Sequence, residues 1–130
     1  MVGITAYGAY IPWHRINRMT IYMSIGFVNP AAIMPGEKAV ANYDEDSLTM
    51  AVNAGMDCLQ GMDRSKIDGI FMATATGPFE ERQNAGIIST ALDLKPESRT
   101  ADFTASVKSG TTALLSACDA AKAGSAKGIL

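Results

Sequence analysis

The chain is expected to bend most sharply within one run of residues, Ala101-Asp102-Phe103-Thr104-Ala105-Ser106-Val107-Lys108-Ser109-Gly110-Thr111-Thr112-Ala113-Leu114. A short strand-like segment reaches a turn of Lys, Ser and Gly and passes directly into a helix of small apolar residues. Such a bend presents one side chain, and it directs free backbone N–H groups and the positive end of the helix dipole to the same point. Enzymes place thiol or hydroxyl nucleophiles at bends of this kind, because the environment lowers a thiol pKa and stabilises an oxyanion. The residue at this bend is Val107, which has no nucleophilic atom.

Strand-like and helical patterns alternate along the rest of the chain. Strands are predicted over residues 2–11, 67–76 and 99–106, with a fourth beginning at 128, and loops over 13–18 and 31–43. Helices are predicted over 19–27, from a cap at Asp44, over 80–94, and over 111–123, where apolar residues almost all round predict a buried helix. The alternation indicates βαβ units, a mainly parallel sheet and one α/β domain without a linker. The helical residues expected to face the core are Leu48, Val52, Gly55, Leu59, Met62, Ile87, Ile88, Ala91 and Leu94.

The bend resembles the nucleophile elbow of the thiolase superfamily, and of the archaeal-type hydroxymethylglutaryl-CoA synthases in particular. Those enzymes carry Ala-Asp, a few residues, Cys-Lys-Ala-Gly-Thr, and then an Ala-rich helix. Alignment on Lys108, Gly110 and Thr111 places the family's acyl-accepting Cys at Val107. A slip of one residue would place it at Ser106, but the three matching residues favour Val107.

Two other segments carry the same resemblance. Residues 35–40 and 44–51 are similar to the family's segment before its first long helix. Residues 69–78 resemble its second core strand and the active-site turn that follows, where the synthases use a Glu as general acid/base. In this chain Ala75 occupies that position, between Thr74 and Thr76.

The resemblance implies a thiolase-like αβαβα sandwich, in which two similar halves pack together and the second half supplies a catalytic His. Residues 1–130 would form part of the N-terminal half, as a fragment or as a subunit that other chains complete. The bend would line an acyl site with Ser106, Lys108, Gly110 and Thr111. From the residues alone, Ser106, Ser109 and Thr111 are also expected to cap the helix.

Few other residues are candidates for chemistry. The resemblance suggests that Arg15 and Arg18 contact the phosphates of coenzyme A, whereas from the residues alone they are solvated surface charges. His14 has no identifiable nucleophile or orienting partner, so a surface or packing role is expected. The acids Glu80, Glu81 and Asp102 are candidates by type only, and we expect Glu80 and Glu81 to be exposed in the first turn of the 80–94 helix. One His and two dispersed Cys give no metal-ligand spacing, so no metal site is expected.

Composition excludes several classes of function. The formal net charge is −2, and Lys and Arg are scattered rather than clustered. This argues against a nucleic-acid partner and against a polybasic membrane patch. The sequence has no run of about 18 uncharged apolar residues, so no membrane-spanning helix is predicted. The start lacks the basic region of a signal peptide. Cys58 and Cys118 lie in apolar helical segments, as buried free thiols of a cytoplasmic protein do.

Three hypotheses about function stay open. The first is an acyl-CoA condensing enzyme of the acyltransferase class, which takes a coenzyme A thioester as substrate and binds no covalent cofactor. The second is a non-catalytic subunit that shapes the acyl pocket of an active paralogue. The third is a thiolase-like aldolase that cleaves CoA esters without an acylated Cys. The family implies homo- or hetero-oligomers of thiolase-like chains, a dimer edge around residues 103–106, and a zinc-bearing OB-fold partner.

Overall fold

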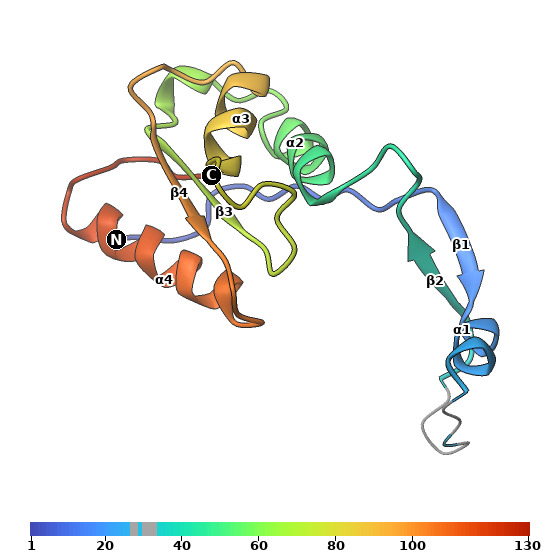
Figure 1. The fold of residues 1–130 in the computed structure, drawn as a ribbon. Helices are drawn as coiled ribbons and strands as arrows, with labels where there is room; N and C mark the ends of the chain where they lie inside the picture. Colours follow the sequence, from blue (N-terminus) through green and yellow to red (C-terminus); the bar gives the residue numbers. More distant parts are fainter. Residues whose placement is uncertain (27–28, 30–33) are drawn as a thin grey trace. The chain divides into compact units, whose positions relative to one another are not determined.

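The computed structural model describes residues 1–26, 29 and 34–130, and it divides them into two compact units. Residues 11–45 form the smaller unit, and residues 1–10 together with 46–130 form the larger one (Figure 1). The predicted loops on either side of the first helix pair with each other, which gives the smaller unit contacts of its own.

The smaller unit is a hairpin with one helix. Strands β1 (His14–Asn17) and β2 (Glu37–Val40) pair antiparallel. Helix α1 (Arg18–Ile25) begins where the Asn17 side chain accepts the N–H of Met19 at 2.8 Å. The predicted 19–27 helix is confirmed over Met19–Ile25, Gly26 ends it with a φ of +70°, and residue 27 lies outside the described residues.

The loop predictions for residues 13–18 and 31–43 were wrong where β1 and β2 form. Both strands are largely exposed, and backbone pairing holds them together. They therefore lack the alternation of apolar and polar residues by which a half-buried strand is recognised.

The larger unit is organised around strand β3 (Gly69–Ala73). Strand β4 (Arg99–Phe103) pairs parallel with one edge of β3, from Gly69↔Arg99 to Ala73↔Phe103. The chain returns to the other edge at Gly128–Leu130, where Ile129 forms a parallel bridge with Gly69. The parallel sheet and its three strand positions, predicted within 67–76, 99–106 and from 128, are confirmed.

The order of the strands fixes which helix covers which face. The connection from β3 to β4 and the connection from β4 back past β3 run in opposite directions across the sheet. Because such crossovers are right-handed, their helices lie on opposite faces. Figure 1 shows this arrangement, with α3 (Asn84–Ala91) on one side of the strands and α4 (Ser109–Lys122) on the other.

The core lies between β3, α3 and helix α2 (Ser47–Cys58), which leads through the short turn η2 (Arg64–Lys66) into β3. Ile70, Ile88 and Leu92 are almost fully buried there. The predicted inward face of α2 is confirmed, with Leu48, Gly55 and Leu59 buried and Val52 and Met62 packed against the core.

Three helix starts or faces differ from the prediction. The cap of α2 is Asp46 rather than Asp44, in a reciprocal pair of hydrogen bonds with Thr49. Helix α3 begins only at Asn84, so Glu80 and Glu81 are exposed ahead of it rather than in its first turn. Ala91, predicted to face inward, is exposed, because the buried side of α3 follows the phase of Ile88 and Leu92.

The predicted first strand, residues 2–11, was also wrong. This segment runs along α2, and Gly8 approaches so closely that a Cβ there would lie 2.3 Å from the backbone nitrogen of Cys58. Leu130 also lies beside α2, since its side chain is the third nearest atom to a Cβ built at Gly55. No strand forms over residues 2–11, and the backbone N–H of Ala9 donates to the Asp57 carboxylate on α2 at 3.0 Å.

The buried helix predicted at 111–123 is present as α4, but it is not buried. Ser109 and Ala113 face the sheet, whereas Leu114 and Leu115 are 51% and 61% exposed. One face of α4 packs on β3 and β4, and nothing in the described part of the chain covers the opposite face.

Asp102 joins β4 to the start of α3. Its carboxylate oxygens accept the backbone N–H of Asn84 at 2.6 Å, the backbone N–H of Ala85 at 2.8 Å and the side-chain amide of Asn84 at 3.0 Å. The Asn84 amide also donates to the carbonyl of Phe79 at 3.1 Å. Asp102 therefore caps a helix that begins eighteen residues earlier in the sequence, and through Asn84 it holds the turn that precedes the helix.

Replacing Asp102 by Ala should destabilise the larger unit by about 2–3 kcal/mol, because partly buried N–H groups lose their acceptor. Urea unfolding with an unchanged m-value measures this. The control is Asp119→Ala on exposed α4, which removes only a long ion pair to Lys122 and should cost less than about 0.5 kcal/mol. Equal costs for the two variants would contradict the assigned role of Asp102.

Acid should weaken the fold only below the ordinary aspartate pKa of 3.8. Hydrogen bonds lower the pKa of three aspartates. The main donor to Asp46 is the Thr49 N–H, and the main donor to Asp63 is the Ser65 hydroxyl. The main donor to Asp68 is the Lys127 N–H. A lowered pKa adds stability above the unfolded value, and that stability is lost as the pH falls through the folded pKa. Thermal melts should therefore show little contribution from these groups between pH 7 and 5 and a decline below 3.8, less steep in Asp68→Asn. A decline that starts near pH 6 would contradict this assignment.

Candidate functional site

The carboxyl ends of β3 and β4 lie side by side, and each leads into one of the two turns singled out in the sequence. The N–H of Thr74, just after β3, donates to the carbonyl of Phe103 at the end of β4, at 3.1 Å. Turn 74–79 and elbow 104–108 therefore leave the sheet at the same edge. In open parallel sheets, ligands bind at the carboxyl ends of strands, where neighbouring connections pass to opposite faces. This edge is the candidate site.

The elbow has the backbone geometry that the sequence predicted. Ala105 has a φ of +61°, which non-glycine residues seldom adopt, and it sends the chain sharply out of β4. Val107 stands at the tip, with its side chain fully exposed. Lys108 is the N-cap residue of α4. The position that the family resemblance gives to a nucleophile is thus fully accessible and holds only methyl groups.

The hydroxyl groups at the elbow are engaged with the backbone. The Ser106 Oγ accepts the N–H of Lys108 at 3.3 Å, and the Ser109 hydroxyl donates to the carbonyl of Ser106. Ser106 and Ser109 thus stabilise the turn ahead of α4, but the expected capping role was wrong, because the N-cap of the helix is Lys108 and no side chain caps it. Thr111 and Gly110 are exposed in the first turn of the helix, and a Cβ at Gly110 would meet no atom within 4 Å.

The second turn is also ordered by hydroxyl groups and carries no acid at the matching position. The Thr74 Oγ1 accepts the N–H of Thr76 at 3.1 Å, and the Ser47 hydroxyl at the start of α2 donates to the carbonyl of Thr76 at 2.8 Å. Between the two threonines, Ala75 is exposed. The turn exposes the side chain of Ala75, but a methyl group can neither donate nor accept a proton.

Asn84 lies behind both turns, and sequence reasoning missed it. It is 1% exposed, its Nδ2 bonds Asp102 and Phe79, and its Oδ1 is buried without a partner among the described residues. A Cβ at Gly77 would lie 3.2 Å from the Nδ2, so the turn packs directly on this amide. The signal in the sequence was an Asn at a helix start, but nothing local linked it to Asp102. Asp102, a candidate acid by type, is a capping residue in the structure.

The residues proposed for the coenzyme A phosphates lie in the smaller unit. The Arg15 guanidinium donates to the carbonyls of its own loop, at 3.0 Å to Trp13 and 2.9 Å to His14, and also to Pro12. Arg18 is the first residue of α1, and its backbone N–H donates to the carbonyl of Gly36. These contacts show how the loop is held, and phosphate binding by either arginine stays a prediction.

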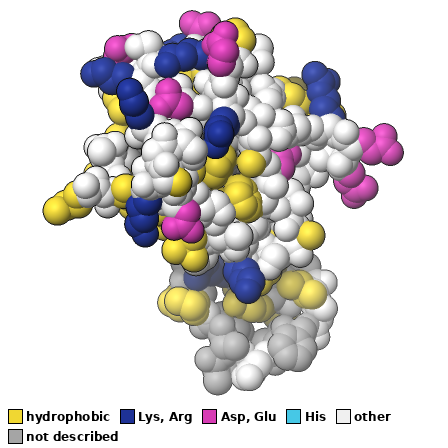
Figure 2. Space-filling view, turned by 90° about the vertical axis from the view of Figure 1, so that its left-hand side faces the viewer, with side chains coloured by type: hydrophobic (Ala, Val, Ile, Leu, Met, Phe, Trp, Pro, Cys, Tyr) yellow, Lys and Arg dark blue, Asp and Glu magenta, His cyan; other side chains and the backbone are white. Residues whose placement is uncertain are grey.

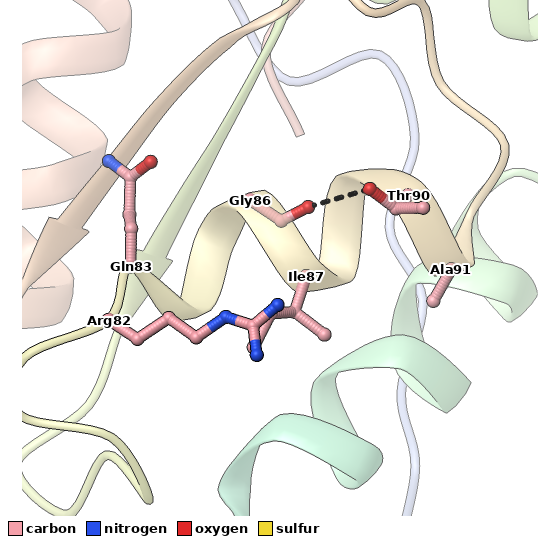
Figure 3. Close-up of a pocket in the computed structure, with 6 residues that line it drawn as sticks. All are labelled: Arg82, Gln83, Gly86, Ile87, Thr90 and Ala91. Atoms are coloured by element: carbon pink, nitrogen blue, oxygen red, sulfur yellow. Dashed lines mark hydrogen bonds between the residues drawn. The ribbon is translucent and has the colours of Figure 1, made fainter.

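A hollow on the surface lies away from the elbow, along the outer side of α3. It encloses about 540 Å³ and is lined by Arg82, Gln83, Gly86, Ile87, Thr90 and Ala91. Figure 3 shows the Arg82 side chain running along the helix toward Ile87, while the Thr90 hydroxyl bonds the Gly86 carbonyl. The hollow is shallow and open, and the hydroxyl of Thr90 within it donates to the backbone of its own helix.

Within residues 1–26, 29 and 34–130, no group of three His, Cys, Asp or Glu side chains lies close enough to hold a metal ion. Over the same residues, no helix is sufficiently long and apolar to cross a membrane. Cys58 ends α2 and Cys118 lies within α4, both as half-buried free thiols.

Curated relatives of the chain are hydroxymethylglutaryl-CoA synthases. The chain is 37% identical over 119 residues to that of Pyrococcus furiosus, covering 89% of this chain and 33% of the relative. It is 33% identical over 118 residues to that of Methanosarcina mazei, covering 87% and 34%. The chain thus spans about a third of the length of these relatives. No family model matches it.

Solved structures of thiolase-fold condensing enzymes have the same fold. MvaS in complex with 3-hydroxy-3-methylglutaryl coenzyme A superposes with a TM-score of 0.82 at 26% identity, covering 95% of this chain and 31% of that chain. The priming β-ketosynthase of the R1128 polyketide pathway superposes with a TM-score of 0.81 at 21% identity, covering 93% and 37%.

Sequence and fold therefore agree on the origin of the elbow and the turn. The chain has the thiolase fold and is similar in sequence to the N-terminal portion of the hydroxymethylglutaryl-CoA synthases.

Proposed function

We propose that this chain binds an acyl-CoA thioester at the edge formed by turn 74–79 and elbow 104–108 and that it forms no acyl-enzyme there. The carrying observation is Val107, fully exposed at the tip of the elbow where the family places its acyl-accepting Cys. A condensing enzyme of this type must transfer the acyl group from the CoA sulfur to a protein nucleophile. A valine has no lone pair with which to attack the thioester carbonyl.

Binding is proposed because the backbone of the site is intact although its reactive side chains are absent. The chain bends after Ala105 and enters α4, and backbone N–H groups in the first turn of that helix are the donors proposed for a thioester carbonyl. MvaS, which has the same fold, is described in complex with a CoA ester. Ser106, Lys108, Gly110 and Thr111 would line the acyl site, and Arg15 and Arg18 are the proposed phosphate contacts.

We also propose that no side chain of this site transfers a proton to or from the bound thioester. Ala75 occupies the family's general acid/base position, and it is exposed between Thr74 and Thr76. The hydroxyl of Ser106, the nearest alternative nucleophile, bonds the N–H of Lys108 and has no base among its described partners. We therefore expect no thiolase or synthase turnover from this polypeptide alone, which is the behaviour of a non-catalytic partner of an active paralogue.

Incubation with acetyl-CoA should give saturable binding without a covalent adduct. Isothermal titration measures the binding, and intact-mass analysis of the same sample detects an added acetyl group. Arg18→Ala should weaken binding about tenfold if this arginine meets a phosphate, because a charge-assisted hydrogen bond contributes about 1.5 kcal/mol. Lys38→Ala, a cation removed from the exposed strand β2 of the same unit, is the matched control.

Two results would overturn the proposal. The first is an acetyl adduct on Ser106, Cys58 or Cys118, which would mean that the chain has a nucleophile after all. The second is the absence of saturable binding, which would remove the acyl-CoA ligand. The fold assignment does not depend on either result.

A further inference from the structure

Strand β4 has an outward edge with which no strand of the described chain pairs. On its inner side, the N–H of Arg99 and the carbonyl of Phe103 form hydrogen bonds of 2.8 and 3.1 Å with the residues that flank β3. Because the backbone groups of successive residues in a strand point to opposite edges, those of Thr100 and Asp102 point away from β3. An open edge of this kind is a template on which another chain can add a strand.

The side-chain amide of Gln83 occupies this edge at Thr100. Its Nε2 donates to the Thr100 carbonyl at 3.0 Å, and its Oε1 accepts the Thr100 hydroxyl at 2.6 Å. Gln83 is the N-cap residue of α3, yet its side chain makes no capping bond to the helix. Figure 3 shows the Gln83 side chain leaving the start of α3 in a different direction from that of Arg82. The amide therefore takes the place in which a peptide group of a neighbouring strand would donate to the same carbonyl.

Charge does little to keep two copies of this chain apart. The formal net charge is only −2. Figure 2 looks onto the side of the molecule on which α4 lies and shows acidic and basic side chains dispersed among hydrophobic ones. On β4 itself, the Asp102 carboxylate bonds the start of α3 instead of extending from the edge. Folded proteins protect an exposed strand edge by charge or by covering it, so the covering of Thr100 by Gln83 is the protection that this edge has.

A second strand could pass along β4 only by displacing the Gln83 amide. Neighbouring strands lie about 4.8 Å apart, so a strand that passed Thr100 would run through the space that the amide fills. An antiparallel ladder centred on Asp102 would use the outward groups of Thr100 in both copies. Two hydrogen bonds in each copy would have to break before that ladder formed.

We propose that Gln83 blocks the outward edge of β4 against strand addition by a second copy of this chain. The contact acts at the amino-terminal end of the strand, whereas the dimer edge that the family resemblance implies lies around residues 103–106. The pair formed by Gln83 and Thr100 thus restricts which part of β4 a partner strand can reach. The proposal rests on these two hydrogen bonds and on the outward position of Thr100, and it is independent of acyl-CoA binding.

Removing the amide should open the edge. In the 130-residue chain, Gln83→Ala should lower the dimer dissociation constant at least tenfold, because the Thr100 carbonyl of each copy becomes free to accept a strand. Sedimentation equilibrium measures this constant. Thr100→Val removes only the hydroxyl bond and should give a smaller shift. Gln60→Ala, at an exposed glutamine that follows α2, is the matched control and should leave association unchanged. Circular dichroism establishes that each variant is folded.

Hydrogen exchange measured by NMR locates the new contact. In Gln83→Ala, the N–H groups of Thr100 and Asp102 should exchange more slowly as the protein concentration rises, and in the unmodified chain they should not. The double variant Gln83→Ala/Thr100→Pro lacks the outward N–H of residue 100 and should associate no more than the unmodified chain. Proline is compatible with this position because the N–H that it removes faces away from β3.

Three results would overturn the proposal. The first is an equal dissociation constant for Gln83→Ala and Gln60→Ala. The second is association of Gln83→Ala that persists in the double variant, since the contact would then lie elsewhere. The third is concentration-dependent protection of Thr100 and Asp102 in the unmodified chain, which would mean that the edge accepts a strand while Gln83 is present.

Discussion

The hydrogen bonds from the start of α3 to the Asp102 carboxylate are the contact on which the rest of the larger unit depends. One side chain on β4 accepts two backbone N–H groups and one amide from a helix that follows β3. This fixes α3 against the sheet, and through Asn84 it fixes the turn that leads into α3. It also fixes β4 one residue before the chain leaves the strand toward the elbow. The Asp102 carboxylate therefore helps to position both turns of the candidate site.

This constraint explains how the backbone of the candidate site keeps its shape although residues 75 and 107 carry no reactive side chain. The elbow is set by the end of β4, by the positive φ of Ala105 and by the serines that bond the backbone ahead of α4. The turn is set by Thr74, Thr76 and Ser47. None of these contacts involves the side chain of residue 75 or 107. Under the proposed function, alanine and valine at those positions supply neither a proton donor nor a nucleophile, and the hydrogen bonds that shape the backbone do not depend on them.

The sequence predicted both strands of the parallel sheet and missed both strands of the exposed hairpin. Strand β3 and the inner face of α2 carry enough apolar residues for their pattern to be recognised. Strands β1 and β2 pair through backbone groups alone and give no such pattern. Residues 2–11 have strand composition, but a strand also needs a neighbour, which composition does not supply. Apolar residues all round α4 predicted burial, and the structure shows one covered face and one exposed face.

The residues of the candidate site also differ in how well the sequence predicted them. The elbow and its exposed Val107 could be placed from a local motif, because strand, bend and helix are adjacent in sequence. The pairing of Asn84 with Asp102 joins residues far apart in sequence, and no local pattern encodes it. Asp102 was consequently read as a possible acid rather than as the cap of a distant helix.

The most direct test of an intact elbow without a nucleophile is the thiol pKa in the variant Val107→Cys. A thiol at the start of α4 should titrate at least about one unit below the ordinary value of about 8.5, because the helix N-terminus stabilises the thiolate. The pH dependence of iodoacetamide alkylation, resolved by peptide mass spectrometry, measures this, with Cys58 and Cys118 as internal references away from a helix start. Alkylation at position 107 with a pKa near or above 8.5 would show that the elbow lacks the geometry assigned to it.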